Sequence, residues 1–221
     1  HQRMFQVEAL GVRAVEPLIK TGPGQVIGGA GVTQLEYAFG VDQRGDEVVV
    51  VDDMSAGVEA RLGSAKLVTI DLAAPAAFEL LKNVMIADGI DAVVHLAARK
   101  KVGESVEKPE WYYSQNVGGM ANLMAAMREA GVKKLVFSSS AATYGMPDVD
   151  KVSEDYPGVP INPYGQTKLI GELMVKNAEV WGLKGVNLRY FNVAGAGASD
   201  LADTAALNLI PIAINAVKAG K

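Results

Sequence analysis

The sequence predicts an α/β protein with a doubly wound parallel sheet, and three features lead to this prediction. Four consecutive valines at 48–51 are typical of a parallel strand that is buried on both faces. Further short apolar runs follow, and segments of helical periodicity separate them. A glycine cluster at 28–31 comes directly after the first apolar run, where a strand would turn into a helix. Strands alternating with helices favour one parallel sheet with crossover helices.

The composition is that of an ordinary globular protein. The 221 residues are 49% hydrophobic and 21% charged, enough for one core and part of a second lobe. A net charge of −4 gives no broad basic surface for nucleic acid. The lack of cysteine excludes thiol catalysis, and two distant histidines indicate no metal site. No apolar run approaches the length of a membrane helix, about 20 residues, so we expect a cytoplasmic protein without a membrane partner.

The elements can be placed in order along the chain. Residues 1–20 have helix-like apolar spacing, and both an accessory helix and an extension peculiar to this chain stay open. A breaker cluster at 21–24 precedes the first strand. Strands are predicted at 25–27, 48–51, 66–72, 91–96, 133–137 and 186–190, and helices at 75–88, 107–130 and from Pro163 onward.

The glycine cluster is a candidate phosphate-binding loop. Gly28 and Gly31 would let the backbone approach a pyrophosphate at the start of a helix. Gln34 stands where the last glycine of the usual pattern would pack the helix onto the strand, which predicts a displaced or weakened first helix. A plain tight turn is the alternative for the cluster taken alone.

Asp52 indicates which dinucleotide would bind. It ends the valine strand about 20 residues after Gly31, the position of the acidic residue that binds the adenosine ribose. A carboxylate accepts the two ribose hydroxyls and repels a 2′-phosphate, so the sequence predicts NAD rather than NADP. A helix N-cap is the alternative role for Asp52.

The strand at 91–96 runs into small residues. Ala97 and Ala98 would let a cofactor pass close to the backbone. His95, within this strand, is interpreted as a core histidine rather than a catalytic base.

A Ser, a Tyr and a Lys form the candidate catalytic set. Ser140 follows the strand at 133–137, while Tyr164 and Lys168 lie four residues apart on the helix that starts at Pro163 and therefore share one face. A phenol has a pKa of about 10, and a nearby ammonium favours the phenolate. We therefore expect Lys168 to lower the pKa of Tyr164 toward working pH for proton transfer coupled to hydride transfer.

Two blocks of sequence carry a family resemblance. Residues 137–145 and 162–168 resemble, in order and spacing, the catalytic blocks of the extended short-chain dehydrogenase/reductases, and most closely those of the UDP-galactose (UDP-glucose) 4-epimerases. The resemblance implies a Rossmann-type NAD-binding domain over 21–195. It also implies that 196–221 start a nucleotide-sugar-binding lobe, incomplete because family members continue past Lys221.

The resemblance implies an NAD-dependent epimerase that inverts C4 of a UDP-hexose by transient oxidation to a 4-keto sugar. Tyr164 would take the C4 hydroxyl proton, Ser140 would hydrogen-bond the reacting oxygen, and Lys168 would bind the nicotinamide ribose. The helix at 107–130 would form a homodimer interface.

The same resemblance implies the remaining site residues. Lys100 would contact the pyrophosphate, Asn116 would brace the catalytic loop, and Tyr190 would approach the nicotinamide. The predicted cofactor-binding residues are Gly28, Gly31, Asp52, Ser55, Asp71, Leu72, Ala97, Ala98, Lys100, Asn116, Ser138, Tyr164, Lys168 and Tyr190. The predicted substrate-binding residues are Ser140, Tyr164, Asn192 and Asn208, the last facing the UDP phosphates.

Other functions stay open at this point. A nucleotide-sugar dehydratase would usually carry an Asp-Glu pair near 139–141, where this chain has Ser139-Ser140-Ala141 and no carboxyl group. A reductase acting on another nucleotide sugar shares the fold and the cofactor. A non-catalytic nucleotide-binding relative is favoured by Gln34 and the incomplete lobe, whereas the intact Ser140, Tyr164 and Lys168 argue against it.

Overall fold

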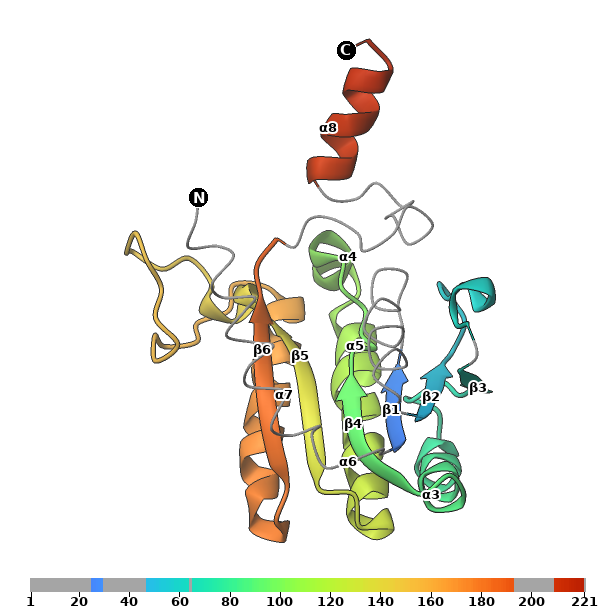
Figure 1. Cartoon of the computed structure of the whole chain (residues 1–221). Coiled ribbons are helices and arrows are strands. Elements are labelled where there is room, and N and C mark those ends of the chain that lie inside the picture. Colours follow the sequence, from blue (N-terminus) through green and yellow to red (C-terminus); the bar gives the residue numbers. More distant parts are fainter. Residues whose placement is uncertain (1–24, 30–46, 64, 193–208, 221) are drawn as a thin grey trace.

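The computed structural model describes residues 25–29, 47–63, 65–192 and 209–220 of the chain (Figure 1). The expectations for the extension at 1–20, for Gly31 and Gln34 and for Asn208 lie outside these residues.

Within the described residues, six parallel strands form one sheet in the order β3-β2-β1-β4-β5-β6. The order reverses between β1 and β4, and in such sheets ligands bind at the carboxyl ends of the strands beside this switch point. The sheet confirms the predicted doubly wound α/β fold. The strands are β1 (Gln25–Gly29), β2 (Glu47–Asp52), β3 (Lys66–Thr69), β4 (Ile90–His95), β5 (Lys134–Ser140) and β6 (Lys184–Tyr190).

The valine run forms β2 and is buried on both faces, as predicted. Val49 and Val51 pack into the larger core cluster, whereas Val48 and Val50 pack into a second cluster on the opposite face. Such burial stabilises the fold by about 1.5–3 kcal/mol for each large apolar side chain.

Helices α3, α6 and α7 contribute to the larger core cluster and cover one face of the sheet (Figure 1). The predicted helix at 75–88 is α3, whose ends lie within two residues of the prediction. The helices are α3 (Ala77–Ala87), α4 (Val102–Glu107), α5 (Pro109–Tyr112), α6 (Gly119–Ala130), α7 (Pro163–Asn177) and α8 (Leu209–Lys218).

The helix predicted at 107–130 is confirmed from Pro109 to Ala130, but it begins two residues later than predicted and is not a uniform α-helix. Lys108 leaves the helical conformation, with φ −136° and ψ 58°, since the proline ring of Pro109 disfavours the α region for the preceding residue. A π-helical turn, Tyr113–Gly118, then separates α5 from α6. Such turns insert one extra residue and change the direction of the side chains that follow.

Helix α7 lies very close to β5 at Gly171. A Cβ atom at Gly171 would be 2.5 Å from Cζ of Phe137 and 3.1 Å from Sδ of Met120, both in the packed core. We expect Gly171→Ala to lower the free energy of unfolding by about 1–3 kcal/mol, because overpacking outweighs the higher helix propensity of alanine. Urea unfolding would measure the change.

Gly103→Ala provides the matched control. Gly103 is an exposed helical glycine in α4, and its Cβ would meet nothing within 4 Å. Alanine should be neutral or stabilising there, so an equal loss in both variants would contradict the close-packing argument.

Candidate active site

The start of α7 fixes the positions of Tyr164 and Lys168. Asn162 caps the helix, since its Oδ1 accepts a hydrogen bond of 2.8 Å from the backbone N–H of Gly165, and Pro163 occupies the first turn. Tyr164 therefore lies in the first turn and Lys168 one turn further along the same face.

Ser140 and Tyr164 come together at the carboxyl end of β5. Ser140 is the last residue of that strand, and its Oγ accepts a hydrogen bond of 3.1 Å from the N–H of Ala142. Burial raises the pKa of the Tyr164 phenol, and a hydrogen bond with the Ser140 side chain only partly offsets this effect. The two predicted catalytic side chains thus interact directly.

Lys168 is buried, with 3% of its surface exposed. Its Nζ donates a hydrogen bond of 2.6 Å to the carbonyl oxygen of Ser138 and lies 5.9 Å from the centre of the Tyr164 ring. Burial lowers the pKa of Lys168 to about 7.

The prediction that Lys168 lowers the pKa of Tyr164 is wrong. The pKa of Tyr164 is raised, and a charge on Lys168 is not among its causes. The ammonium is directed at a backbone carbonyl and at the face of the phenol ring, and burial of both groups disfavours their charged forms. Spacing along the helix predicted proximity correctly but not orientation.

His95 is a core residue, as the sequence indicated. It is 4% exposed and stacks on Phe137 with ring centres 5.8 Å apart. Burial, with a smaller effect from the charge of Lys168, lowers the pKa of His95 to about 3. Its neutral imidazole therefore contributes to packing.

The lowered pKa of His95 predicts how stability depends on pH. Below about pH 6.5 the unfolded chain binds a proton at this histidine that the folded chain does not bind until about pH 3, so stability falls as the pH falls through this window. We expect His95→Phe to weaken this dependence by up to about 1.4 kcal/mol per pH unit. Urea unfolding at several pH values in this window would measure it, and parallel curves for the two proteins would refute it.

The predicted residues on β6 lie at the same edge of the sheet. Tyr190 pairs in register with Ser140, which brings the end of β6 beside the candidate catalytic serine. Asn192 follows two residues later and is exposed.

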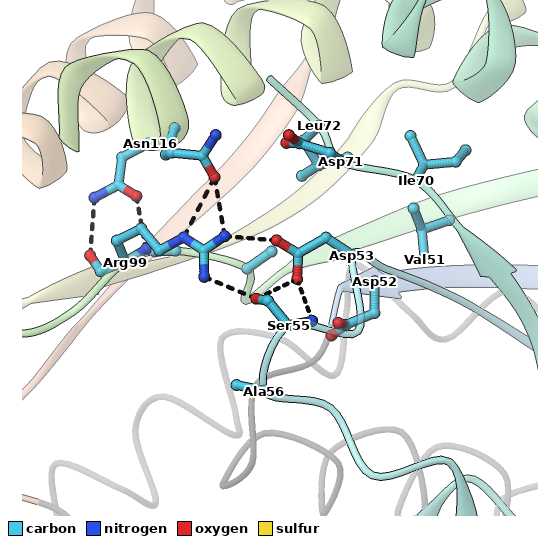
Figure 2. Close-up of a pocket in the computed structure, with 13 residues that line it drawn as sticks. Val51, Asp52, Asp53, Ser55, Ala56, Ile70, Asp71, Leu72, Arg99 and Asn116 are labelled. Carbon is cyan, nitrogen blue, oxygen red and sulfur yellow. Dashed lines mark hydrogen bonds and ion pairs between the residues drawn. The ribbon is translucent and has the colours of Figure 1, made fainter. Parts of the chain in front are cut away.

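A pocket lies at the carboxyl ends of β2 and β4 (Figure 2). Gly28 of β1 pairs with Val50 and Val94 and so lies between these two strands. Lys100 is exposed, in the segment that follows β4. The predicted cofactor-binding residues that line the pocket are Asp52, Ser55, Asp71, Leu72, Ala97, Ala98 and Asn116.

Two adjacent carboxylates shape the loop after β2. Oδ1 of Asp52 accepts a hydrogen bond of 2.6 Å from the N–H of Met54, and Oδ1 of Asp53 accepts bonds of 2.9 and 2.6 Å from the N–H and the hydroxyl of Ser55. The next helical turn has Val58 at its N-cap position, so Asp52 is not a helix N-cap. Its carboxylate lies at the pocket instead.

Arg99 is a pocket residue that sequence reasoning missed. Its guanidinium contacts Asp53 at 2.6 Å and Ser55 Oγ at 2.8 Å (Figure 2). It also donates to Gln115 Oε1 at 3.2 Å. It also lies 5.0 Å from the centre of the Trp111 ring. Only its position directly after Ala97 and Ala98 could have indicated this role.

Asn116 joins the pocket to the catalytic helix. Its Oδ1 accepts a hydrogen bond of 2.8 Å from the N–H of Arg99, and its Nδ2 donates one of 3.0 Å to the Arg99 carbonyl (Figure 2). The same Nδ2 also donates a bond of 3.0 Å to Thr167 Oγ1. Thr167 in turn donates a bond of 2.7 Å to the Tyr164 carbonyl. Because Asn116 belongs to the π-helical turn, that turn directs its amide between the two segments.

The pocket and the candidate catalytic set therefore share one edge of a parallel sheet. A family model described as NAD dependent epimerase/dehydratase family matches residues 26–221. The chain belongs to this family. Its membership accounts for the sheet order and for a carboxylate placed at the end of β2.

Relatives within the family are UDP-glucose 4-epimerases. The enzyme of Corynebacterium glutamicum is 44% identical over 173 residues, which are 77% of this chain and 51% of that protein. The enzyme of Azospirillum brasilense is 43% identical over 197 residues, which are 87% of this chain and 56% of that protein. The chain thus spans about half the length of the curated relatives that it matches.

Solved structures of family members agree with the fold. The UDP-glucose 4-epimerase from Brucella ovis in complex with NAD has a TM-score of 0.75 and 39% identity, covering 78% of this chain and 53% of that one. The enzyme from Stenotrophomonas maltophila, with bound NAD and formylated UDP-arabinopyranose, has a TM-score of 0.81 and 34% identity, covering 89% and 62%. None of the helices that the structure describes combines the length and the apolar character needed to cross a membrane.

Proposed function

We propose that the protein is an NAD-dependent epimerase that inverts C4 of a UDP-hexose, interconverting UDP-glucose and UDP-galactose. The observation that carries this proposal is the contact between Ser140 and Tyr164, with buried Lys168 one helical turn away. The relatives that are 43–44% identical and bear the name UDP-glucose 4-epimerase support it.

The described residues fit NAD. Asp52 offers a carboxylate to ribose hydroxyls at one end of the sheet edge, and Ala97 and Ala98 leave room beside the backbone. Bound NAD would supply a hydride acceptor that takes the hydride from C4 and returns it to the opposite face. The Lys168 ammonium has three N–H donors, of which one binds the Ser138 carbonyl, so it can also donate to a ribose hydroxyl.

Proton transfer is the task of Tyr164. Its phenolic oxygen would accept the proton of the C4 hydroxyl and give it back when the hydride returns. The single hydroxyl proton of Ser140 favours the Tyr164 phenolate before the sugar binds, and it would donate to the reacting oxygen once the phenol has taken the C4 hydroxyl proton. Lys168, with a pKa of about 7, can hold or release a proton near neutral pH beside this pair.

Two measurements on the full chain test the proposal. Incubation with UDP-galactose should yield UDP-glucose in a coupled assay, and acid-denatured protein should release NAD that is seen by its absorbance. Protein that forms no UDP-glucose and releases no dinucleotide would overturn the proposal.

No observation favours the alternative dehydratase. The carboxylate that contacts Ser139 belongs to Glu172, and Arg189 binds both of its oxygens, at 2.8 and 2.6 Å. Formation of a 4-keto-6-deoxy product from the UDP-sugar would nevertheless identify that activity.

The proposal includes a homodimer in the cytoplasm, as expected from the sequence. Two apolar side chains of α4 are exposed, Val102 at 47% and Val106 at 62%. Exposed apolar side chains of this kind support a subunit contact that includes α4. Sedimentation equilibrium would test the dimer and cell fractionation the location.

A further inference from the structure

The Arg99 guanidinium lies in the same pocket as Asp52, the carboxylate expected to bind the adenosine ribose, so its charge bears on cofactor choice. Asp53 and Ser55 bind it from the loop that directly follows Asp52 (Figure 2). Gln115 binds it from the π-helical turn. Among the described residues that line the pocket, Arg99 is the single cation. Its direct partner Asp53 is the residue next to Asp52, so the guanidinium is held beside the loop that carries the expected ribose-binding carboxylate.

An arginine at this place could serve either of two cofactors. Guanidinium groups bind phosphates in a bidentate manner, and an arginine near the ribose accommodates the 2′-phosphate that distinguishes NADP from NAD. The outcome depends on whether the guanidinium is free to turn toward that phosphate.

Asp53 restrains this guanidinium. The ion pair joins Nη2 of Arg99 to Oδ2 of Asp53 at 2.6 Å, and the two side chains are only 26% and 27% exposed. Ser55 Oγ, itself bound to Asp53 Oδ1, takes the other terminal nitrogen at 2.8 Å. Both terminal nitrogens of the guanidinium are thus engaged within the protein, on the side of the loop after β2.

We propose that Asp53 is a specificity-determining residue that keeps the pocket selective for NAD, because it binds the Arg99 guanidinium that would otherwise bind the 2′-phosphate of NADP. The inference rests on the proposed function for the identity of the cofactor. It differs from the role of Asp52, which acts on the ribose directly, because Asp53 acts through Arg99.

Cofactor competition on the full chain tests the proposal. Each protein is equilibrated with equal concentrations of NAD and NADP, and the ratio of bound NADP to bound NAD is measured after extraction. We expect Asp53→Asn, which keeps the shape of the side chain and removes its charge, to raise this ratio about tenfold. Asp53→Glu, which keeps the charge, should leave the ratio near that of the parent.

The double variant Asp53→Asn/Arg99→Leu separates the proposal from a general effect of charge. If the released guanidinium binds the 2′-phosphate, the double variant should not show the raised ratio of bound NADP to bound NAD. Its ratio should instead equal that of Arg99→Leu alone. A gain that persists in the double variant would overturn the proposal, and so would an unchanged ratio in Asp53→Asn. Asp53→Ser serves as a second uncharged variant if Asp53→Asn fails to fold.

The same measurement distinguishes the two proposals. A parent that binds NAD, with a ratio that no variant changes, would refute the role of Asp53 and leave the proposed function standing. A parent that binds neither dinucleotide would refute both.

Discussion

Replacing Tyr164 with phenylalanine should reduce epimerase turnover by about 10²–10⁴-fold, the usual contribution of a general acid–base residue. The phenolic oxygen is the group proposed to take the proton of the C4 hydroxyl, and phenylalanine removes that oxygen while keeping the ring. Conversion of UDP-galactose to UDP-glucose, measured with saturating NAD, would give the effect on turnover.

Tyr113→Phe is the matched control for this experiment. Tyr113 also lies near α7, where its hydroxyl donates to Oε1 of Gln166 at an exposed position. Its loss should change turnover less than about fivefold, because such an exposed hydrogen bond contributes about 1 kcal/mol or less. Turnover of Tyr164→Phe within a few-fold of the parent would remove the phenol from the proposed mechanism.

The raised pKa of Tyr164 means that its phenolate is unfavourable in the free protein. Because burial disfavours the phenolate, the site must stabilise that anion during proton transfer, and among the described groups the Ser140 side chain does so. Ser140→Ala should therefore also slow turnover, by a smaller factor than Tyr164→Phe, with the two losses less than additive. A coupled assay on the single and double variants would measure this, and fully additive losses would contradict the direct contact.

Features set by local sequence were predicted well. The valine run gave β2 and its burial on both faces, and the small residues after β4 marked one wall of the pocket. Pro163 predicted the start of α7, because proline is favoured in the first turn of a helix.

Features set by tertiary contacts were not predicted. The π-helical turn has no local signal in the sequence, unlike the break at Lys108, which Pro109 could have indicated. The pKa of Tyr164 depends on burial and side-chain direction, which spacing does not reveal. Arg99 contacts Asp53 across 46 positions of sequence, so its role became visible only in the folded chain.

The contact between Glu172 and Arg189 is another feature of this kind, and it predicts the largest effect on stability. The carboxylate of Glu172 on α7 binds Nε and Nη2 of Arg189 on β6, and the hydroxyl of Ser139 on β5 donates to the same carboxylate. The side chains of Glu172 and Arg189 are only 8% and 22% exposed. This bidentate pair therefore ties the catalytic helix to the ends of two strands.

Arg189→Met should lower the free energy of unfolding by about 3–5 kcal/mol, because it leaves the buried Glu172 carboxylate without its cation. Urea unfolding would measure the loss. The matched control is Lys66→Met, which breaks an ion pair of 2.7 Å with Asp88 where the lysine side chain is 55% exposed. That change should cost about 1 kcal/mol or less.

The double variant Glu172→Leu/Arg189→Met decides what the pair contributes. If most of the loss in Arg189→Met comes from the uncompensated charge, removing both charges should restore much of the stability, since apolar replacements of buried pairs are often neutral. A double variant as unstable as Arg189→Met would instead mean that the link between α7 and β6 itself holds the catalytic helix in place. In that case the distance between Ser140 and Tyr164 would depend on the contact between Glu172 and Arg189, which involves neither of those two residues.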